Sequence, residues 1–219
     1  MPDAPGRLLL GIDLGSSALK VAVLDPDVGI LATQSHEVAQ YSEHPNWSEA
    51  DPEEWWNAVC AAIPIVLNAA QVSSDDVGAV SVTGMVPAVL VLDDRGRPLR
   101  RAILQNDARA SKEIAQIRET LGDLDLLERT GSILSQQSVA PTALWLARHE
   151  PAVWLKTRSI QGSYDWVARE LGAGLFVESN WALESGLYNI DMTPLTQVQH
   201  ATGIAWPELL EVQLSLIHI

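Results

Sequence analysis

Two apolar runs flank a small polar turn near the start of the chain. The runs cover Leu8 to Ile12 and Leu19 to Leu24, and the turn between them is Gly15-Ser16-Ser17. Apolar runs joined by a short Gly/Ser turn are typical of a tight β-hairpin. The polar positions of residues 30–39 suit the exposed face of a third strand, so the pattern predicts an opening three-stranded meander.

A helix start follows the meander. Asp51 is suited to the N-cap, Pro52 to the first helical position, and the two glutamates that follow to the positive end of a helix. We expect this helix to run toward Asn68. Pro64 lies inside it and predicts a kink or a break, because proline removes a backbone donor.

The rest of the chain alternates between predicted strands and helices. Residues 77–83 are apolar and β-branched, which predicts a strand buried on both faces, with residues 88–92 as its neighbour. Further helices are expected after residue 109, over 140–149 and 163–171 and near 193–203, with a strand over 159–161 and an irregular stretch over 177–191. This order predicts an α/β domain with a mixed sheet.

Composition narrows the classes of function. The chain has 219 residues, with 28 acidic against 14 basic side chains and a net charge of −14, which argues against a nucleic-acid or anionic-membrane surface. The single cysteine, Cys60, cannot form an internal disulfide, which favours a reducing cytoplasm. The sequence has no signal-peptide pattern and no apolar run of the roughly 18 residues that a membrane span needs. We therefore expect a cytoplasmic protein without membrane or nucleic-acid partners.

The hairpin turn has the chemistry of a phosphate site. Gly15 allows close backbone approach, and the hydroxyls of Ser16 and Ser17 and successive N–H groups can donate to phosphate oxygens. A carboxylate such as Asp13 would repel the phosphate unless a cation lay between them, which suggests Mg²⁺ held through water. Lys20 either assists or is only solvated. Taken alone, the same residues also fit an ordinary turn between two core strands.

Three stretches together resemble the FGGY family of carbohydrate kinases, of the actin-like ATPase superfamily, most closely its xylulose-kinase-like members. They are Gly11 to Ser17 with Lys20, the run Trp47-Ser-Glu-Ala-Asp-Pro-Glu-Glu-Trp-Trp56, and Val80 through Arg109. The second is the most specific. The resemblance implies an actin-like ATPase (ribonuclease H-like) domain, a mixed β-sheet flanked by helices, over residues 1–213.

The resemblance also assigns roles to residues. It implies that ATP and Mg²⁺ are cofactors and that a sugar or polyol is the substrate, with Asp13 near the metal, Gly15, Ser16, Ser17 and Lys20 around the γ-phosphate, and Met85, Val86, Asn106, Asp107 and Arg109 on the sugar side. An Asn/Asp pair can bond vicinal hydroxyls while an arginine orients the carboxylate. The alternative for Asn106-Asp107 is a helix cap beside a solvated arginine.

Two departures from the family pattern alter the expected sugar pocket. Met85-Val86-Pro87 stands where many relatives have a polar run, which removes hydrogen-bonding side chains. Gln105 stands where an aromatic residue often precedes Asn106. Either the substrate is less hydroxylated at that end, or other residues compensate, with Gln105, Gln136 and Tyr164 as candidates. The sequence does not name the sugar.

Two parts of the family's site are not found before Ile219. These are the catalytic aspartate of a Gly-Gly-Asp type motif and the second, nucleotide-binding domain, so no catalytic residue is assigned. Residues 214–219 are expected to be a non-native tail, with a genuine apolar terminal strand as the alternative. We therefore expect this chain to be the substrate-binding half of a kinase and to be inactive alone. The sequence leaves open whether the full-length enzyme is a homodimer. A non-catalytic sugar-sensing or scaffold module is the alternative, and a different actin-like ATPase is disfavoured by the signature from Trp47 to Trp56.

Overall fold

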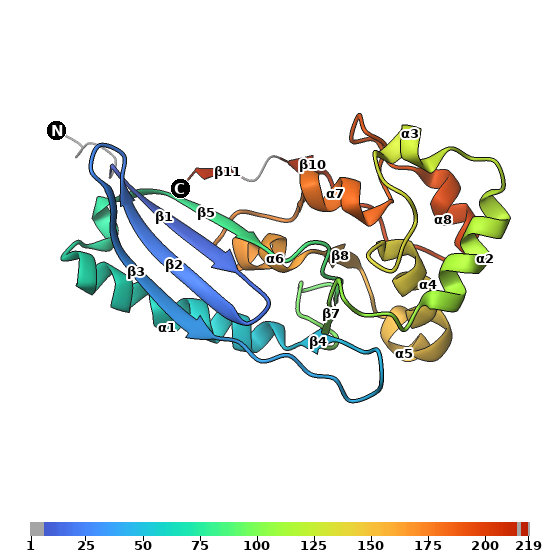
Figure 1. Ribbon diagram of the computed structural model, residues 1–219, viewed down its shortest axis with the longest axis horizontal. Coiled ribbons are helices and arrows are strands. Elements are labelled where there is room, and N and C mark those ends of the chain that lie inside the picture. The colour runs from blue at the N-terminus through green and yellow to red at the C-terminus, as the bar shows by residue number, and fades with distance from the viewer. Residues whose placement is uncertain (1–6, 214–215, 219) are drawn as a thin grey trace.

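A five-stranded mixed sheet, in the order β11-β5-β1-β2-β3, forms one end of the elongated molecule (Figure 1). The computed structural model describes residues 7–213 and 216–218. Strands β1, β2 and β3 form the predicted antiparallel meander, and β5 pairs with β1 in parallel. The strands are β1 (Leu8–Leu14), β2 (Ala18–Asp25), β3 (Gly29–Glu37), β4 (Glu49–Ala50), β5 (Val77–Gly84), β6 (Leu90–Leu92), β7 (Ala102–Ile103), β8 (Ser159–Gln161), β9 (Val177–Glu178), β10 (Val212–Gln213) and β11 (Leu216–His218).

Helices lie along the sheet and make up most of the other end of the molecule (Figure 1). They are α1 (Pro52–Ala70), α2 (Ser111–Leu121), α3 (Leu126–Thr130), α4 (Val139–His149), α5 (Pro151–Trp154), α6 (Ser163–Glu170), α7 (Ser179–Ser185) and α8 (Thr196–Thr202), with a 3-10 turn at Ser74–Asp76. None of the helices in the described ranges is long and apolar enough to cross a membrane.

The two faces of the sheet differ because apolar and polar residues alternate along its strands. One face carries buried side chains such as Leu10, Ile12 and Val21, and α1 and α6 pack against the strands of the sheet. The other face carries small and polar residues, among them the exposed Gly11 and Lys20. Burial of the apolar face is the main stabilising contribution of this half of the fold.

Helix α1 begins where the sequence predicts. The Oδ1 atom of Asp51 accepts a hydrogen bond from the Glu53 N–H at 3.0 Å, and Pro52 occupies the first turn. Of the kink or break predicted at Pro64, the break is wrong, since α1 continues to Ala70. Burial of an apolar stripe that includes Trp55 offsets the loss of one backbone hydrogen bond at the proline.

Two predictions about β5 and its surroundings are wrong. Strand β5 is buried on one face only, because the exposed Ser81 and Thr83 alternate with the buried Val80 and Val82. Residues 88–92 do not pair with β5; β6 pairs with β8 instead, in a separate two-stranded sheet. All three residues of β6 are buried, and a fully apolar run carries no alternation to indicate its partner.

The last part of the chain is more regular than expected. The stretch 177–191, predicted to be irregular, contains β9 and α7. Of the expected tail, residues 214, 215 and 219 lie outside the described residues, while β11 pairs antiparallel with β5.

Candidate functional site

The turn between β1 and β2 is closed tightly and leaves its hydroxyls exposed. The Gly15 N–H donates to the Ala18 carbonyl at 3.1 Å, and a Cβ at Gly15 would lie only 2.9 Å from that oxygen. The segment after β3 supports the turn from outside, because Gln40 Nε2 donates to the Ser16 carbonyl at 2.7 Å. The side chains of Ser16 and Ser17 are exposed and make no hydrogen bond to the described part of the chain. They are free to donate to a ligand.

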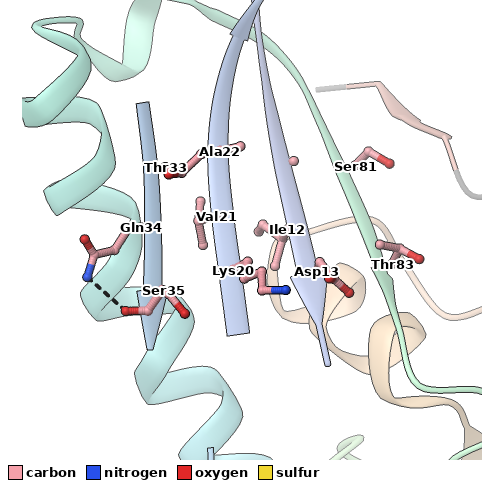
Figure 2. A pocket seen from close by; sticks show the side chains of 11 residues that line it. Ile12, Asp13, Lys20, Val21, Ala22, Thr33, Gln34, Ser35, Ser81 and Thr83 are labelled. Atoms are coloured by element: carbon pink, nitrogen blue, oxygen red, sulfur yellow. Dashed lines mark hydrogen bonds between the residues drawn. The ribbon is translucent and has the colours of Figure 1, made fainter. Parts of the chain in front are cut away.

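Asp13 and Lys20 lie next to each other on the exposed face of the sheet. The β-sheet register places Asp13 opposite Lys20 on β2 and beside Thr83 on β5. These residues line a shallow hollow of about 540 Å³ together with small residues such as Gly11 and Ala22 (Figure 2). Within residues 7–213, neither Asp13 nor Lys20 forms an ion pair. Their charges are therefore available to a ligand.

A single carboxylate, Asp13, suits Mg²⁺ better than a metal ion that takes all its ligands from protein side chains. The described residues contain no cluster of three or more His, Cys, Asp or Glu side chains placed to hold a metal. Mg²⁺ usually keeps several waters and takes one or two carboxylates plus phosphate oxygens. Asp13 beside the turn meets that requirement.

The ends of β1 and β5 are pressed together, which brings Met85 close to the hairpin. The Met85 N–H donates to the Leu14 carbonyl at 3.1 Å. A Cβ at Gly84 would lie 2.8 Å from the same carbonyl oxygen, so only glycine allows this approach. Met85 is 7% exposed and Val86 is half-buried. The predicted phosphate turn and the predicted sugar side thus meet at the end of the sheet.

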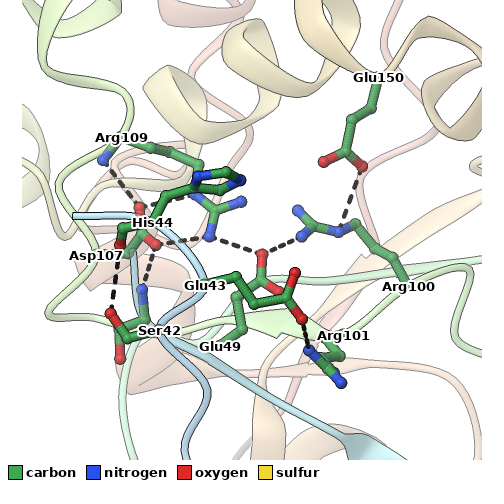
Figure 3. A network of polar contacts seen from close by, with 10 residues as sticks. Ser42, Glu43, His44, Glu49, Arg100, Arg101, Asp107, Arg109 and Glu150 are labelled. Atoms are coloured by element: carbon green, nitrogen blue, oxygen red, sulfur yellow. Dashed lines mark hydrogen bonds and ion pairs between the residues drawn. The ribbon is translucent and has the colours of Figure 1, made fainter. Parts of the chain in front are cut away.

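Asn106, Asp107 and Arg109 separate into one exposed and two buried residues. Asn106 is exposed, whereas the side chains of Asp107 and Arg109 are 2% and 1% exposed. Arg109 donates to Asp107 through Nε at 2.9 Å and through Nη2 at 2.7 Å (Figure 3). The alternative of a helix cap with a solvated arginine is wrong, because the arginine is buried and the N-cap of α2 is Ala110.

A buried network holds these two residues, and several of its members were not predicted. We call it the Glu49 network; its charged members are Glu49, Arg100, Asp107, Arg109 and Glu150. The Glu49 carboxylate pairs with both arginines, and Arg100 also reaches Glu150 at 3.4 Å (Figure 3). The sequence did mark Trp47 to Trp56, which includes Glu49, as a signature. The signal that could have indicated a structural role is a tryptophan and a glutamate two residues apart, shortly before the N-cap Asp51.

Trp47 from the same segment covers the network. The guanidinium carbon of Arg109 lies 3.8 Å from the centre of the Trp47 ring and 5.0 Å from that of Trp145. A guanidinium at this distance from an aromatic face is attracted by the ring electrons, more strongly when it is desolvated. The arginine is therefore fixed by carboxylates at its edge and by a ring over its face.

Sequence and fold both match one group of proteins. The profile of the "FGGY family of carbohydrate kinases, N-terminal domain" matches residues 8–211. The chain belongs to the FGGY family. This confirms the resemblance and the actin-like fold class, a mixed sheet flanked by helices.

Xylulose kinases are among the relatives of this FGGY chain. One from Staphylococcus epidermidis is 31% identical over 183 residues, which cover 84% of this chain and 36% of the relative. One from Escherichia coli is 35% identical over 147 residues, covering 67% and 30%. The crystal structure of xylulose kinase from Rhodospirillum rubrum has a TM-score of 0.88 and 32% identity, covering 94% of this chain and 43% of that structure. The chain spans well under half the length of these relatives.

Another buried acid of this FGGY domain, Asp165, forms no ion pair with any residue that the structure describes. Asp165 accepts hydrogen bonds from the N–H groups of Gly162 at 2.9 Å and Glu178 at 3.0 Å. The pKa of Asp165 is raised to about 7, mainly because the carboxyl group is buried. The two hydrogen bonds lower this pKa, and the nearby charge of Glu178 raises it. The Tyr164 hydroxyl donates to Glu178 at 3.0 Å, so this expected compensating residue is engaged inside the protein.

Proposed function

We propose that this chain is the sugar-binding part of an ATP-dependent carbohydrate kinase, which transfers phosphate to a hydroxyl of a sugar or polyol, and that it is inactive by itself. The observation that carries the proposal is the meeting of the exposed Gly15–Ser17 turn with Met85 at the ends of β1 and β5. Phosphoryl transfer needs a phosphate cradle next to an oriented hydroxyl. The family membership and the xylulose kinases among the relatives favour a pentulose as the substrate.

On the phosphate side, the backbone N–H groups and hydroxyls of Gly15, Ser16 and Ser17 would bind the phosphate of ATP, and Lys20 would balance its charge. Asp13 would hold Mg²⁺ through water. The bound Mg²⁺ would supply positive charge to the transferring phosphoryl group. No residue of this chain is assigned as the base that accepts the proton of the sugar hydroxyl.

On the sugar side, Met85 and Val86 would form an apolar wall and Asn106 would donate and accept hydrogen bonds. Gln105 adds an acceptor, because its Oε1 atom is buried without a hydrogen-bond partner among the described residues. Leaving a buried polar atom unpaired is costly, and a sugar hydroxyl would satisfy it. Asp107 and Arg109, expected to face the sugar, lie behind this surface.

The test compares two proteins, this chain and the product of its complete reading frame, on a panel of pentuloses and polyols. We expect the complete product to release ADP in the presence of a pentulose and Mg-ATP, and this chain to release none. Robust turnover by this chain alone would contradict the proposed inactivity. Sugar binding without turnover by the complete product would favour the sensing module.

A further inference from the structure

The turn from Leu104 to Ala108 is tied to the signature segment by backbone bonds. The Leu104 N–H donates to the Ser48 carbonyl at 3.0 Å, and the Ala108 N–H donates to the Asn46 carbonyl at 2.9 Å. Between these two bonds, the Asp107 N–H donates to the Leu104 carbonyl at 3.0 Å and closes the turn. Gln105 and Asn106 therefore form the tip of a turn whose two ends are fixed to residues 46–48.

The side chains of the Glu49 network fix the same turn a second time. The Asp107 Oδ2 atom accepts from the Ser48 N–H at 2.6 Å, and Asp107 also binds the Arg109 fork. Arg109 Nη2 lies 2.7 Å from Glu49 Oε1, which links the far side of the turn to β4. Both carboxylate oxygens of Asp107 and two of the three guanidinium nitrogens of Arg109 are thus engaged inside the protein.

Asp107 and Arg109 lie too deep to touch a sugar at the surface of the turn, since their side chains are only 2% and 1% exposed. The remaining nitrogen, Arg109 Nη1, has no hydrogen-bond partner among the described residues, but it is buried, and the Trp47 ring covers the guanidinium face. Two arginines share Glu49, so the charge of this carboxylate is compensated without an outside ligand. The network therefore lies behind the turn tip and is connected directly to it.

We infer that Glu49, Asp107 and Arg109 are positioning residues, which hold Gln105 and Asn106 in the orientation that binds the sugar. The inference rests on the proposed function, since it takes the turn tip to be part of the sugar side. It changes the role expected for Asp107 and Arg109 from direct hydrogen bonding to orientation. A small displacement of a binding group is enough to reduce catalysis strongly.

The test uses Arg109→Lys and Glu49→Gln in the full-length kinase. Lysine keeps the charge but lacks the planar fork that binds two carboxylates, and glutamine keeps the shape of Glu49 without its charge. We expect each variant to raise KM for the sugar by about tenfold to a hundredfold, with KM for ATP unchanged. The double variant should be no worse than the worse single one, because both substitutions break the same ion pair.

The matched control is Arg97→Lys. Arg97 donates through Nε and Nη2 to Asp93 in a similar two-pronged pair, but on an exposed turn and with a side chain that is 67% exposed. We expect its KM values to equal those of the unmodified kinase. Melting temperatures of all variants show whether a raised KM comes from unfolding of the protein or from a changed orientation of the turn.

Replacing the turn tip separates orientation from direct contact. If Arg109 acts only through Gln105 and Asn106, Arg109→Lys should add no further rise in KM for the sugar to the rise caused by Gln105→Ala with Asn106→Ala. A further rise in KM in that background would show that Arg109 contacts the sugar directly, and the inference would be overturned. Unchanged KM values in Arg109→Lys and Glu49→Gln would overturn it as well.

Hydrogen–deuterium exchange on this chain tests the network without any turnover. We expect faster exchange of the Leu104, Asp107 and Ala108 amides in Arg109→Lys than in the unmodified chain, and no change in Arg97→Lys. Unchanged exchange would overturn the positioning role. A full-length protein that phosphorylates no sugar, combined with faster exchange, would instead refute the proposed function and leave the network's effect on the turn established.

Discussion

The hairpin face and the Glu49 network use the same kinds of charged residue in opposite ways. Asp13 and Lys20 stand next to each other on an exposed sheet face and form no ion pair in the part of the chain that the structure describes. Asp107 and Arg109, in contrast, are almost fully buried and bound to each other. Exposed, unpaired charges cost little to maintain and are ready for a ligand. Buried charges require partners, and those partners use up their binding capacity. The predicted phosphate side and the predicted sugar side of the site therefore differ in whether their charged residues are exposed and whether they are paired.

The largest expected effect on stability is that of Arg109→Ala, which removes a buried arginine. Removing the guanidinium leaves the Glu49 and Asp107 carboxylates in a buried site with one cation fewer. We expect the free energy of unfolding of this chain to fall by about 3–5 kcal/mol, the usual loss when one partner of a buried pair is removed. Urea denaturation followed by tryptophan fluorescence measures it.

Arg97→Ala is the control for that loss, because it removes an arginine from an exposed pair with Asp93. Exposed pairs contribute little to stability since water screens them. A loss in Arg97→Ala as large as that in Arg109→Ala would contradict the distinction between the two arginines.

Asp13→Asn tests the role of the unpaired carboxylate on the exposed hairpin face. Because Asp13 has no ion pair among the described residues, we expect stability to change by less than about 0.5 kcal/mol. In the full-length kinase we expect kcat/KM to fall by at least about a hundredfold, since the residue would no longer attract the metal that neutralises the phosphoryl group. Kinetic assays over a range of Mg²⁺ concentrations measure this.

Asp27→Asn serves as its control, because Asp27 is an exposed carboxylate on the turn at the other end of β2. It should retain full activity. If Asp13→Asn also retained full activity, the metal assignment would be refuted while the fold would be unaffected.

Asp165 is an intermediate case, because it is a buried carboxylate that pairs with no arginine among the described residues. Its pKa is raised to about 7, so the folded protein holds this proton more tightly than the unfolded chain does. The stabilising contribution is present at low pH and is lost as the pH rises through about 7. Between about pH 5 and pH 8 we expect this group to remove on the order of 2 kcal/mol from the free energy of unfolding.

Comparison with Asp165→Asn isolates that contribution from the titration of other groups. The amide does not titrate, so we expect the stability difference between the unmodified chain and Asp165→Asn to vary over this pH range. A difference that stays constant with pH would show that Asp165 is already ionised in the folded protein at about pH 5.

Local patterns in the sequence were sufficient for some features of the fold and not for others. The hairpin turn and the start of α1 at Asp51 were predicted correctly because Gly15 and the Asp51 cap act on neighbouring residues. The pairing of β6 was wrong because its partner β8 lies far away in the sequence and an apolar strand does not identify its partner. Helices α3 and α7 were missed because such short helices depend on packing more than on their own sequence.

The candidate site shows the same limit. The exposure of Ser16 and Ser17 followed from the turn pattern, and their phosphate role stays a prediction. The burial of Asp107 could not be predicted, because the N–H group that binds it belongs to Ser48, 59 residues earlier. A sequence motif identified the right turn, but only the folded structure separates the exposed Asn106 from the buried Asp107.

The smallest expected effect concerns Trp47, which explains why the signature begins with an aromatic residue. Phenylalanine keeps a ring over Arg109 but interacts with a cation more weakly, so Trp47→Phe should cost about 0.5–1 kcal/mol of stability. Combined with Arg109→Lys, the cost should shrink, since a lysine ammonium does not lie flat against the ring as a guanidinium does. A double-mutant cycle measures this coupling. Zero coupling would mean that Trp47 acts through packing alone, and that the carboxylates of Glu49 and Asp107 are sufficient to fix the arginine behind the turn.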